Sequence, residues 1–276
     1  MNCYKKSIFV LLLPILFACS KDDGASTAKQ KNSTEQNVSY VESVNSQPTS
    51  NRNYYIFASE SIMPLAAHNA NGNAMEGFEF ELLKAIATQE GFTIKGVIRP
   101  KKMLLDMLEN GESDIIGGGI VVNNKNSQNM DFTQPYAYFN QALLVREENS
   151  TILALNNLSD KSVAVTKDTA SASFLSSNKS IAAQTFDTPF QVARAVSLGR
   201  VEAAVMDAPL ASYYSKQDNM RLRVIYLDTQ RNTFAFGIKK NREDLQQKLN
   251  SGLQKVIRDG TYRDLYVKWF RTEPVW

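Results

Sequence analysis

Cysteine and histidine are almost absent from this chain of 276 residues. The two cysteines, Cys3 and Cys19, both stand near the start, so the rest of the sequence offers neither a disulfide nor a cysteine-ligated metal site. The one histidine, His68, falls in a polar loop, which is typical of a solvated side chain. HExxH, CxxC, P-loop and G-x-S-x-G motifs are lacking as well. The sequence therefore predicts no metal site and no cofactor.

An excess of charge of one sign is also lacking. The chain has 31 Lys and Arg against 28 Asp and Glu, a formal net charge of +3. The charge falls to +1 once an N-terminal segment with Lys5 and Lys6 is removed. So small a charge gives no electrostatic attraction to a polyanion. Nucleic acid is not an expected partner.

Ile8 to Phe17 is the apolar run of the N-terminal segment, and it is too short to span a bilayer. Lys5 and Lys6 precede it and Ala18 follows, which is the layout of a secretory signal peptide over residues 1–18. The sequence Leu16 to Cys19 resembles the bacterial lipobox. That resemblance implies that Cys19 becomes the lipidated first residue of a mature, membrane-anchored protein.

The residues after Cys19 are expected to form a tether. Some lipoproteins have aspartate directly after the lipidated cysteine. This chain has Ser20 there, which resembles the pattern of lipoproteins sent to the outer membrane. We therefore expect a periplasmic protein that is anchored to the outer membrane rather than to the inner membrane. Ser20 to Arg52 has almost no large apolar residues and cannot offset its ordering entropy. Residues 19–52 are thus predicted to be a flexible tether with a mean reach of about 30 Å.

From Asn53 onward, segments with strand and helix patterns alternate, which predicts an α/β fold with largely parallel sheets. Gly111 to Tyr136 is the most informative stretch. It places a short buried strand, Asp114 to Ile116, before the run Gly117 to Gly119 and the motif D-F-T-Q-P-Y. Three glycines let a backbone approach a ligand closely, although tight packing under a helix would favour the same residues.

The order of these motifs resembles the family 3 extracellular solute-binding proteins, which serve ABC importers. The segment Arg200 to Asp207 and the C-terminal D-G-T and K-W-F sequences fit the same family. The resemblance implies a two-lobed, type II periplasmic-binding-protein-like α/β fold. Lobe one is expected from residues 53–146 and 231–276 and lobe two from residues 147–230. Two crossing strands, Tyr138 to Arg146 and Asn232 to Lys239, would join them.

The family resemblance also suggests where a ligand binds. In that family the small-residue run and an arginine six residues before the motif Phe hold a ligand α-carboxylate. Here Gly118 and Gly119 fill the run, and Asn126 stands at the arginine position. The scaffold is therefore expected without its carboxylate clamp, unless Arg99, Arg146 or Arg194 reaches the cleft by another route.

Three further residues are carried over as candidates. Glu81 matches an acidic position of the G-F-x-x-D-L motif, but a helix-start carboxylate is an equal alternative. Thr169 begins a Ser/Thr-rich helix that could bind an anion or simply be N-capped, and the preceding Asp168 would discourage an anion. Asp207 matches the family aspartate that binds a ligand ammonium; otherwise it is a strand-end cap.

The sequence thus predicts a monomeric, lipid-anchored solute-binding protein that delivers a small polar ligand, which is amino-acid-like, an amine or a neutral polar solute, to an ABC transporter permease. Acidic residues without a matched cation favour amines or neutral polar solutes over free α-amino acids. Two alternatives stay open. Ile116 to Ile120 is similar to the G-G-I run of cyclohexadienyl dehydratases, which would make the chain an enzyme on the same fold. A ligand sensor subunit is the other.

Overall fold

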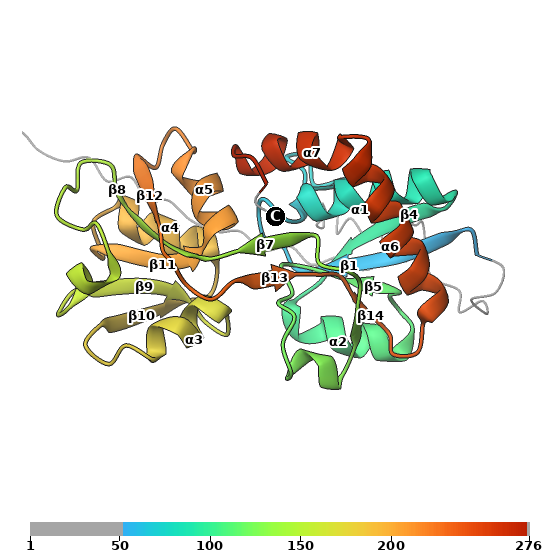
Figure 1. The fold of residues 1–276 in the computed structure, drawn as a ribbon, viewed down its shortest axis with the longest axis horizontal. Helices are drawn as coiled ribbons and strands as arrows, with labels where there is room; N and C mark the ends of the chain where they lie inside the picture. Colours follow the sequence, from blue (N-terminus) through green and yellow to red (C-terminus); the bar gives the residue numbers. More distant parts are fainter. Residues whose placement is uncertain (1–51, 275–276) are drawn as a thin grey trace, which may run out of the picture. The chain divides into compact units, whose positions relative to one another are not determined.

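The computed structural model describes residues 52–274. The predicted signal peptide, Cys19 and all of the tether except Arg52 lie outside the described residues. Within them, two five-stranded sheets form separate α/β halves, here called lobe one and lobe two (Figure 1). No helix in the range 52–274 is long and apolar enough to cross a membrane.

Lobe one is built on a sheet of strand order β4-β1-β5-β14-β6. Its strands are β1 (Tyr54–Ser59), β4 (Thr93–Ile98), β5 (Ile115–Ile116), β6 (Asp131–Phe132) and β14 (Gly237–Ile238). β1 pairs in parallel with β4 and β5, whereas β14 is antiparallel to β5 and β6. A small hairpin, β2 (Ala67–His68) with β3 (Met75–Glu76), precedes the first helix. Because β1, β4 and β5 are parallel, their carboxyl ends meet at one edge of the sheet.

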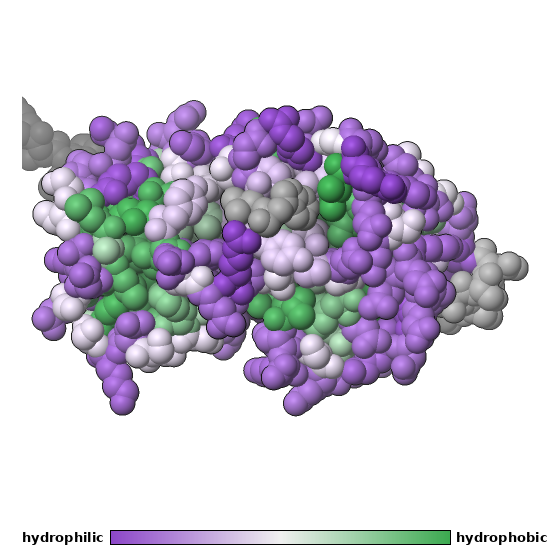
Figure 2. Space-filling view, in the orientation of Figure 1, coloured by the Kyte–Doolittle hydropathy of each residue, from purple (hydrophilic) through white to green (hydrophobic). Residues whose placement is uncertain are grey.

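The helices of lobe one are α1 (Phe78–Glu90), α2 (Lys101–Asn110), α6 (Glu243–Arg258) and α7 (Thr261–Phe270). α1 and α2 both end at left-handed glycines, Gly91 and Gly111, as their sequence predicts. α6 buries Leu245, Leu249 and Leu253 on one face, and the outward side of α6 and α7 is largely hydrophilic (Figure 2). Phe78 lies at the centre of an aromatic cluster with Tyr136, Tyr262, Tyr266 and Phe270.

Lobe two has the strand order β10-β9-β11-β8-β12. Its elements are β8 (Gln141–Arg146), β9 (Ser162–Thr166), α3 (Ala170–Ser176), β10 (Ala182–Phe186), α4 (Pro189–Ser197), β11 (Ala203–Asp207), α5 (Ala208–Ser215) and β12 (Leu222–Tyr226). β9, β10 and β11 are parallel, and β8 is antiparallel to β11 and β12. Two short 3-10 helices, Asn126–Gln128 in lobe one and Leu155–Leu158 in lobe two, complete the elements.

The structure divides the first predicted crossing strand, Tyr138 to Arg146, into two shorter strands. β7 (Ala137–Phe139) and β13 (Asn232–Phe234) pair antiparallel between the sheets. Asn140 then interrupts the first crossing strand, since its side-chain amide donates to the carbonyls of Leu227 and Thr229 in the second segment. β8 follows and belongs to the second sheet. The predicted boundary after residue 146 was therefore too late by one strand.

Candidate functional site

The lobe-one side of the candidate site lies where β1 and β5 end. Ser59 closes β1, Glu60 follows it, and Gly117 to Gly119 continue from β5. A Cβ on Gly117 would lie 2.7 Å from the Phe57 ring and collide with the Glu79 carboxylate, so only glycine fits. Gly118 and Gly119 have φ angles of 99° and 72°, which glycine adopts at low cost. The packing at Gly117 and the backbone conformation at Gly118 and Gly119 thus both require glycine.

Glu79 lies directly beneath the glycine run and is fully buried. Its Oε2 accepts a hydrogen bond from the Gly118 N–H at 2.7 Å, and Oε1 accepts one from the Gly119 N–H at 2.8 Å. The Tyr136 hydroxyl also donates to Oε1. Burial raises the pKa of the Glu79 carboxyl, and the three donors oppose that shift. The two amide groups therefore point into the protein.

Glu60 is an acidic side chain at the rim that was not among the ligand-binding residues expected from the sequence. Its Cγ lies next to Gly118, because a Cβ built there would be 3.3 Å away. Burial raises the pKa of Glu60, and Lys101 lowers it only partly, since its Nζ is 3.9 Å from Oε1. The available sequence signal was its place immediately after a strand whose carboxyl end faces the site.

Asn126 and Asn123 use their polar groups within their own loop. The Asn126 side-chain amide donates to the Val121 carbonyl at 2.8 Å, and the Asn126 backbone N–H donates to Asn123 Oδ1 at 2.9 Å. Asn126 stays half-buried, while Asn123 is exposed. The position where the family has an arginine thus offers no charge and has its amide donor engaged.

Glu81 lies two residues from Glu79 but on a different side of α1. Its carboxylate pairs with Lys268 Nζ at 2.6 Å and accepts a hydrogen bond from Trp269 Nε1 at 3.0 Å. Both partners are in α7. The structure therefore brings Glu81 to the packing of α1 on α7 and does not bring it to Gly118 and Gly119.

Asp207 ends β11 in lobe two and is buried with Gln141 and Ser171. Gln141 Nε2 donates to Asp207 Oδ1 at 2.8 Å, and Ser171 Oγ lies 3.1 Å from the same oxygen. The serine has a single hydrogen, and a shorter contact of 2.6 Å joins it to Gln141 Oε1. Burial raises the pKa of Asp207, and these hydrogen bonds only partly oppose it. Among residues 52–274 no cation pairs with this carboxylate.

Thr169 acts as the N-cap of α3. Its hydroxyl accepts a hydrogen bond from the Ala172 N–H at 3.2 Å and donates to the Thr166 carbonyl at 2.6 Å. Asp168 beside it is exposed and has a φ of 55°. α3 is thus capped by its own side chain, as the alternative reading of this helix start predicted.

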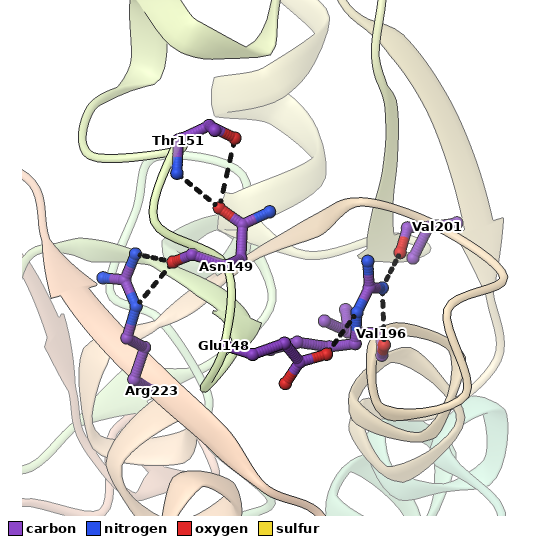
Figure 3. Close-up of polar contacts among 7 residues, drawn as sticks. Glu148, Asn149, Thr151, Val196, Val201 and Arg223 are labelled. Atoms are coloured by element: carbon purple, nitrogen blue, oxygen red, sulfur yellow. Dashed lines mark hydrogen bonds and ion pairs between the residues drawn. The ribbon is translucent and has the colours of Figure 1, made fainter.

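The arginines that could have replaced the missing clamp have other partners. Arg146 Nη1 donates to the carbonyls of Val196 and Val201, and its Nε contacts Glu148. Arg223 donates to the Asn149 carbonyl (Figure 3) and to the Ile152 carbonyl in the same lobe. Arg99 follows β4 at the site edge of lobe one, where it is exposed and donates to the Ile98 carbonyl. Arg146 and Arg223 thus bind backbone carbonyls within lobe two.

Two cavities open beside these groups. One of 340 Å³ lies between Ser61 to Met63 and residues of α4 and α5, and one of 390 Å³ lies beside β7 and the end of β12. Neither is lined by Gly118, Asn126 or Asp207. In the part of the chain from 52 to 274, no three His, Cys, Asp or Glu side chains are grouped as a metal site. Glu60 with the glycine run in lobe one, and Asp207 in lobe two, are therefore two separate groups of candidate residues, and neither cavity joins them.

Comparison with known proteins agrees with this architecture. Residues 55–272 match the family described as bacterial extracellular solute-binding proteins, family 3. A probable amino-acid-binding protein, YxeM, of Bacillus subtilis strain 168 is 26% identical over 215 residues, which cover 75% of this chain and 80% of that protein. A probable histidine-binding protein of Neisseria gonorrhoeae is 26% identical over 226 residues, covering 80% and 84%.

Among solved structures, the ancestral amino-acid-binding protein AncCDT-1, described as a precursor of cyclohexadienyl dehydratase, superimposes with a TM-score of 0.69. It is 27% identical, and the match covers 79% of this chain and 95% of that one. The predicted two-lobed α/β fold is confirmed by this likeness and by the two sheets.

Proposed function

The chain belongs to the bacterial extracellular solute-binding proteins of family 3, and on that premise we propose that it captures a small cationic or neutral polar solute, foremost an amine, for an ABC importer. Members of the family bind small polar ligands, and the relatives above are named for amino acids. The ligand class proposed here differs from theirs because the polar groups at the site differ.

The observation that carries the proposal is the balance of charge at the site. Asp207 is a buried carboxylate without a cationic partner among residues 52–274, and Glu60 at the other lobe has only Lys101 at 3.9 Å. An ammonium group would supply the missing partner for either. Closure of both lobes on one ligand is favoured when each lobe contacts it. A ligand carboxylate would meet the uncharged Asn126 instead.

A thermal-shift screen over amines, amino acids, sugars and nucleosides tests the ligand class. A ligand present at 100 times its dissociation constant adds about 2.7 kcal/mol to the free energy of unfolding, which is readily seen as a rise in Tm. We expect amines to raise Tm and their α-amino acid counterparts to raise it less. A screen in which only amino acids stabilise the protein would contradict the proposal.

Amine binding should weaken as the pH falls. Burial raises the pKa of both Glu60 and Asp207, so each takes up a proton at a higher pH than an ordinary carboxylate. Only the ionised form pairs with an ammonium, so affinity is full above the raised pKa values. Affinity should fall by up to about tenfold per pH unit below each of them. Calorimetric titration between pH 4 and pH 8 measures this, and a flat profile would count against both carboxylates as ligand groups.

Binding rather than catalysis is the function we infer for the site. The likeness to a precursor of cyclohexadienyl dehydratase, together with Ile116 to Ile120, keeps an enzyme as the second candidate. Glu60 is the rim acid with a raised pKa, as a general acid would need. Incubating the protein with a cyclohexadienyl alcohol and following the loss of water distinguishes the two. Turnover that is lost in Glu60→Gln would favour the enzyme.

We further propose that the mature chain is a monomer tethered to a membrane through Cys19, with the outer membrane preferred and an ABC permease as its partner. Replacing Cys19 with serine should release soluble protein into the periplasmic fraction, because the thiol that carries the lipid is gone. Fractionation of cells that express the two forms is the measurement. Unchanged membrane association of Cys19→Ser would disprove the anchor, while the ligand proposal would stand.

A further inference from the structure

We propose that the cavity of 390 Å³ beside the crossing segments is a second ligand site and that it binds a small aromatic monocarboxylate of the size of benzoate. Neither Glu60 nor Asp207 lines this cavity, so it is separate from the residues proposed to bind an amine. The inference concerns a different ligand at a different place, and it does not rest on the proposed function.

The walls of the cavity come from both lobes and from both crossing segments. Pro209 in α5 and Tyr226 at the end of β12 belong to lobe two, and Tyr266 in α7 belongs to lobe one. Phe139 ends β7, and Arg231 directly precedes β13. Small-molecule sites occur preferentially at such boundaries between domains, with usual volumes of about 300–1,000 Å³. A ligand in this cavity contacts both lobes and so favours the arrangement of the lobes that this structure has.

Tyr266 provides a hydrogen-bond donor at the wall of the cavity. The residue is only 4% exposed, and its ring packs against those of Phe78 and Phe270, with centroids 5.6 and 4.5 Å away. Its hydroxyl has no hydrogen-bond partner among residues 52–274. Burial raises the pKa of Tyr266, and the Tyr226 hydroxyl, which belongs to the same cavity wall, raises it further. The Tyr266 hydroxyl therefore stays protonated and can donate to an oxygen atom of a ligand.

Arg231 provides a positive charge at the same cavity. It is exposed, and its guanidinium makes no hydrogen bond or ion pair with another residue in the part of the chain that the structure describes. Glu273 also lines the cavity, but its carboxylate is already paired, since it accepts hydrogen bonds from Arg263 Nε at 2.9 Å and Nη2 at 2.5 Å. A guanidinium matches the two oxygens of a carboxylate with a fixed fork of donors. The unpaired Arg231 therefore favours an anionic ligand.

The remaining walls fit an aromatic ring. Phe139 and Leu227 provide apolar surface. Tyr226 is 61% exposed, and its hydroxyl lies 2.8 Å from Ser212 Oγ in α5, a hydrogen bond that holds the tyrosine ring at the cavity. A ligand ring can pack against the Tyr226 ring in an offset or edge-to-face arrangement. An apolar wall with an aromatic ring, beside one cation and one hydroxyl donor, thus indicates an aromatic carboxylate.

Benzoate is the probe, and the thermal shift at neutral pH is the measurement. Sodium benzoate should raise the Tm of the wild-type protein in a saturable manner, relative to sodium chloride at the same concentration. Benzyl alcohol has the same ring and no charge, so it should bind at least about tenfold more weakly. No rise in Tm with benzoate, or an equal rise with benzyl alcohol, would overturn the proposal.

Two variants test the donors. Arg231→Gln replaces the guanidinium by an uncharged amide and should weaken benzoate binding at least about tenfold. Tyr266→Phe keeps the packed ring and removes only the hydroxyl, so it should weaken binding about threefold or more. Arg200→Gln is the matched control, because Arg200 is an exposed arginine of lobe two that does not line the cavity, and it should bind benzoate as the wild type does. Unchanged affinity in Arg231→Gln or Tyr266→Phe would contradict the proposal.

Asp207→Asn separates this cavity from the proposed amine site. It should bind benzoate as tightly as the wild-type protein, because Asp207 does not line the cavity. Loss of benzoate binding in Asp207→Asn would mean that benzoate binds at the amine site, and the inference would be wrong. If no amine binds the wild-type protein while benzoate binding depends on Arg231, the proposed function fails and the second site stands.

Discussion

Asp207→Ala is expected to weaken amine binding by on the order of 2–5 kcal/mol, because truncating one partner of a buried charge pair leaves the other unpaired. Asp207 is buried at the end of β11, and its carboxylate has only neutral hydrogen-bond donors around it. In lobe two, the Asp207 carboxylate would therefore provide most of the electrostatic stabilisation of a bound ammonium. Calorimetry with an amine found in the thermal-shift screen measures the loss.

Two companion variants separate charge from shape. Asp207→Asn keeps the volume and an oxygen that can accept from Gln141, so it should retain the fold and still lose most of the affinity. Asp168→Asn neutralises an exposed carboxylate of the same lobe, tolerates the φ of 55° at this position, and should change affinity little. If Asp207→Asn binds the amine as tightly as the wild type does, Asp207 is a strand-end cap and the ligand ammonium binds elsewhere.

Phe78→Ala is expected to cost about 3–5 kcal/mol of the free energy of unfolding, as for other large buried aromatic side chains. The Phe78 ring is fully buried, and its centroid lies 4.9 Å from that of Phe270 and 5.6 Å from that of Tyr266. Its removal would leave a cavity where α1 meets α7. Urea denaturation followed by circular dichroism gives the value.

Phe190→Ala is the control for this substitution, because Phe190 is 54% exposed in α4. It should change the free energy of unfolding by less than about 1 kcal/mol. Similar losses for both variants would mean that the aromatic cluster around Phe78 contributes no more than a surface residue does.

The fold was predictable because its signals are local and repeated. The alternation of strand and helix patterns after Asn53 predicted an α/β chain, and the glycines after α1 and α2 marked the helix ends that the structure has. The break at Asn140 was not predictable, since it depends on hydrogen bonds to carbonyls at Leu227 and Thr229, 87 and 89 residues away in sequence. Long-range contacts of this kind leave no pattern around the residue itself.

The same reason limits the prediction of the site. Asp207 was expected at the end of a buried strand, and it lies there. Glu79 and Glu81 stand two residues apart on one helix, and family pattern selected Glu81. The structure turns Glu79 toward the glycine run and Glu81 toward α7, because the buried side of α1 includes Glu79, Leu82 and Leu83. A buried acid between apolar helix positions was the signal that could have identified Glu79.

The central claim is that the site prefers an amine to the corresponding free amino acid. Calorimetric titration of the wild-type protein with agmatine and with arginine, which differ by one α-carboxylate, tests it most directly. The account predicts that agmatine binds at least about tenfold more tightly, a difference of about 1.4 kcal/mol. Micromolar binding of arginine, with agmatine equal or weaker, would contradict it and would mean that a cation such as Arg99 holds the carboxylate after all.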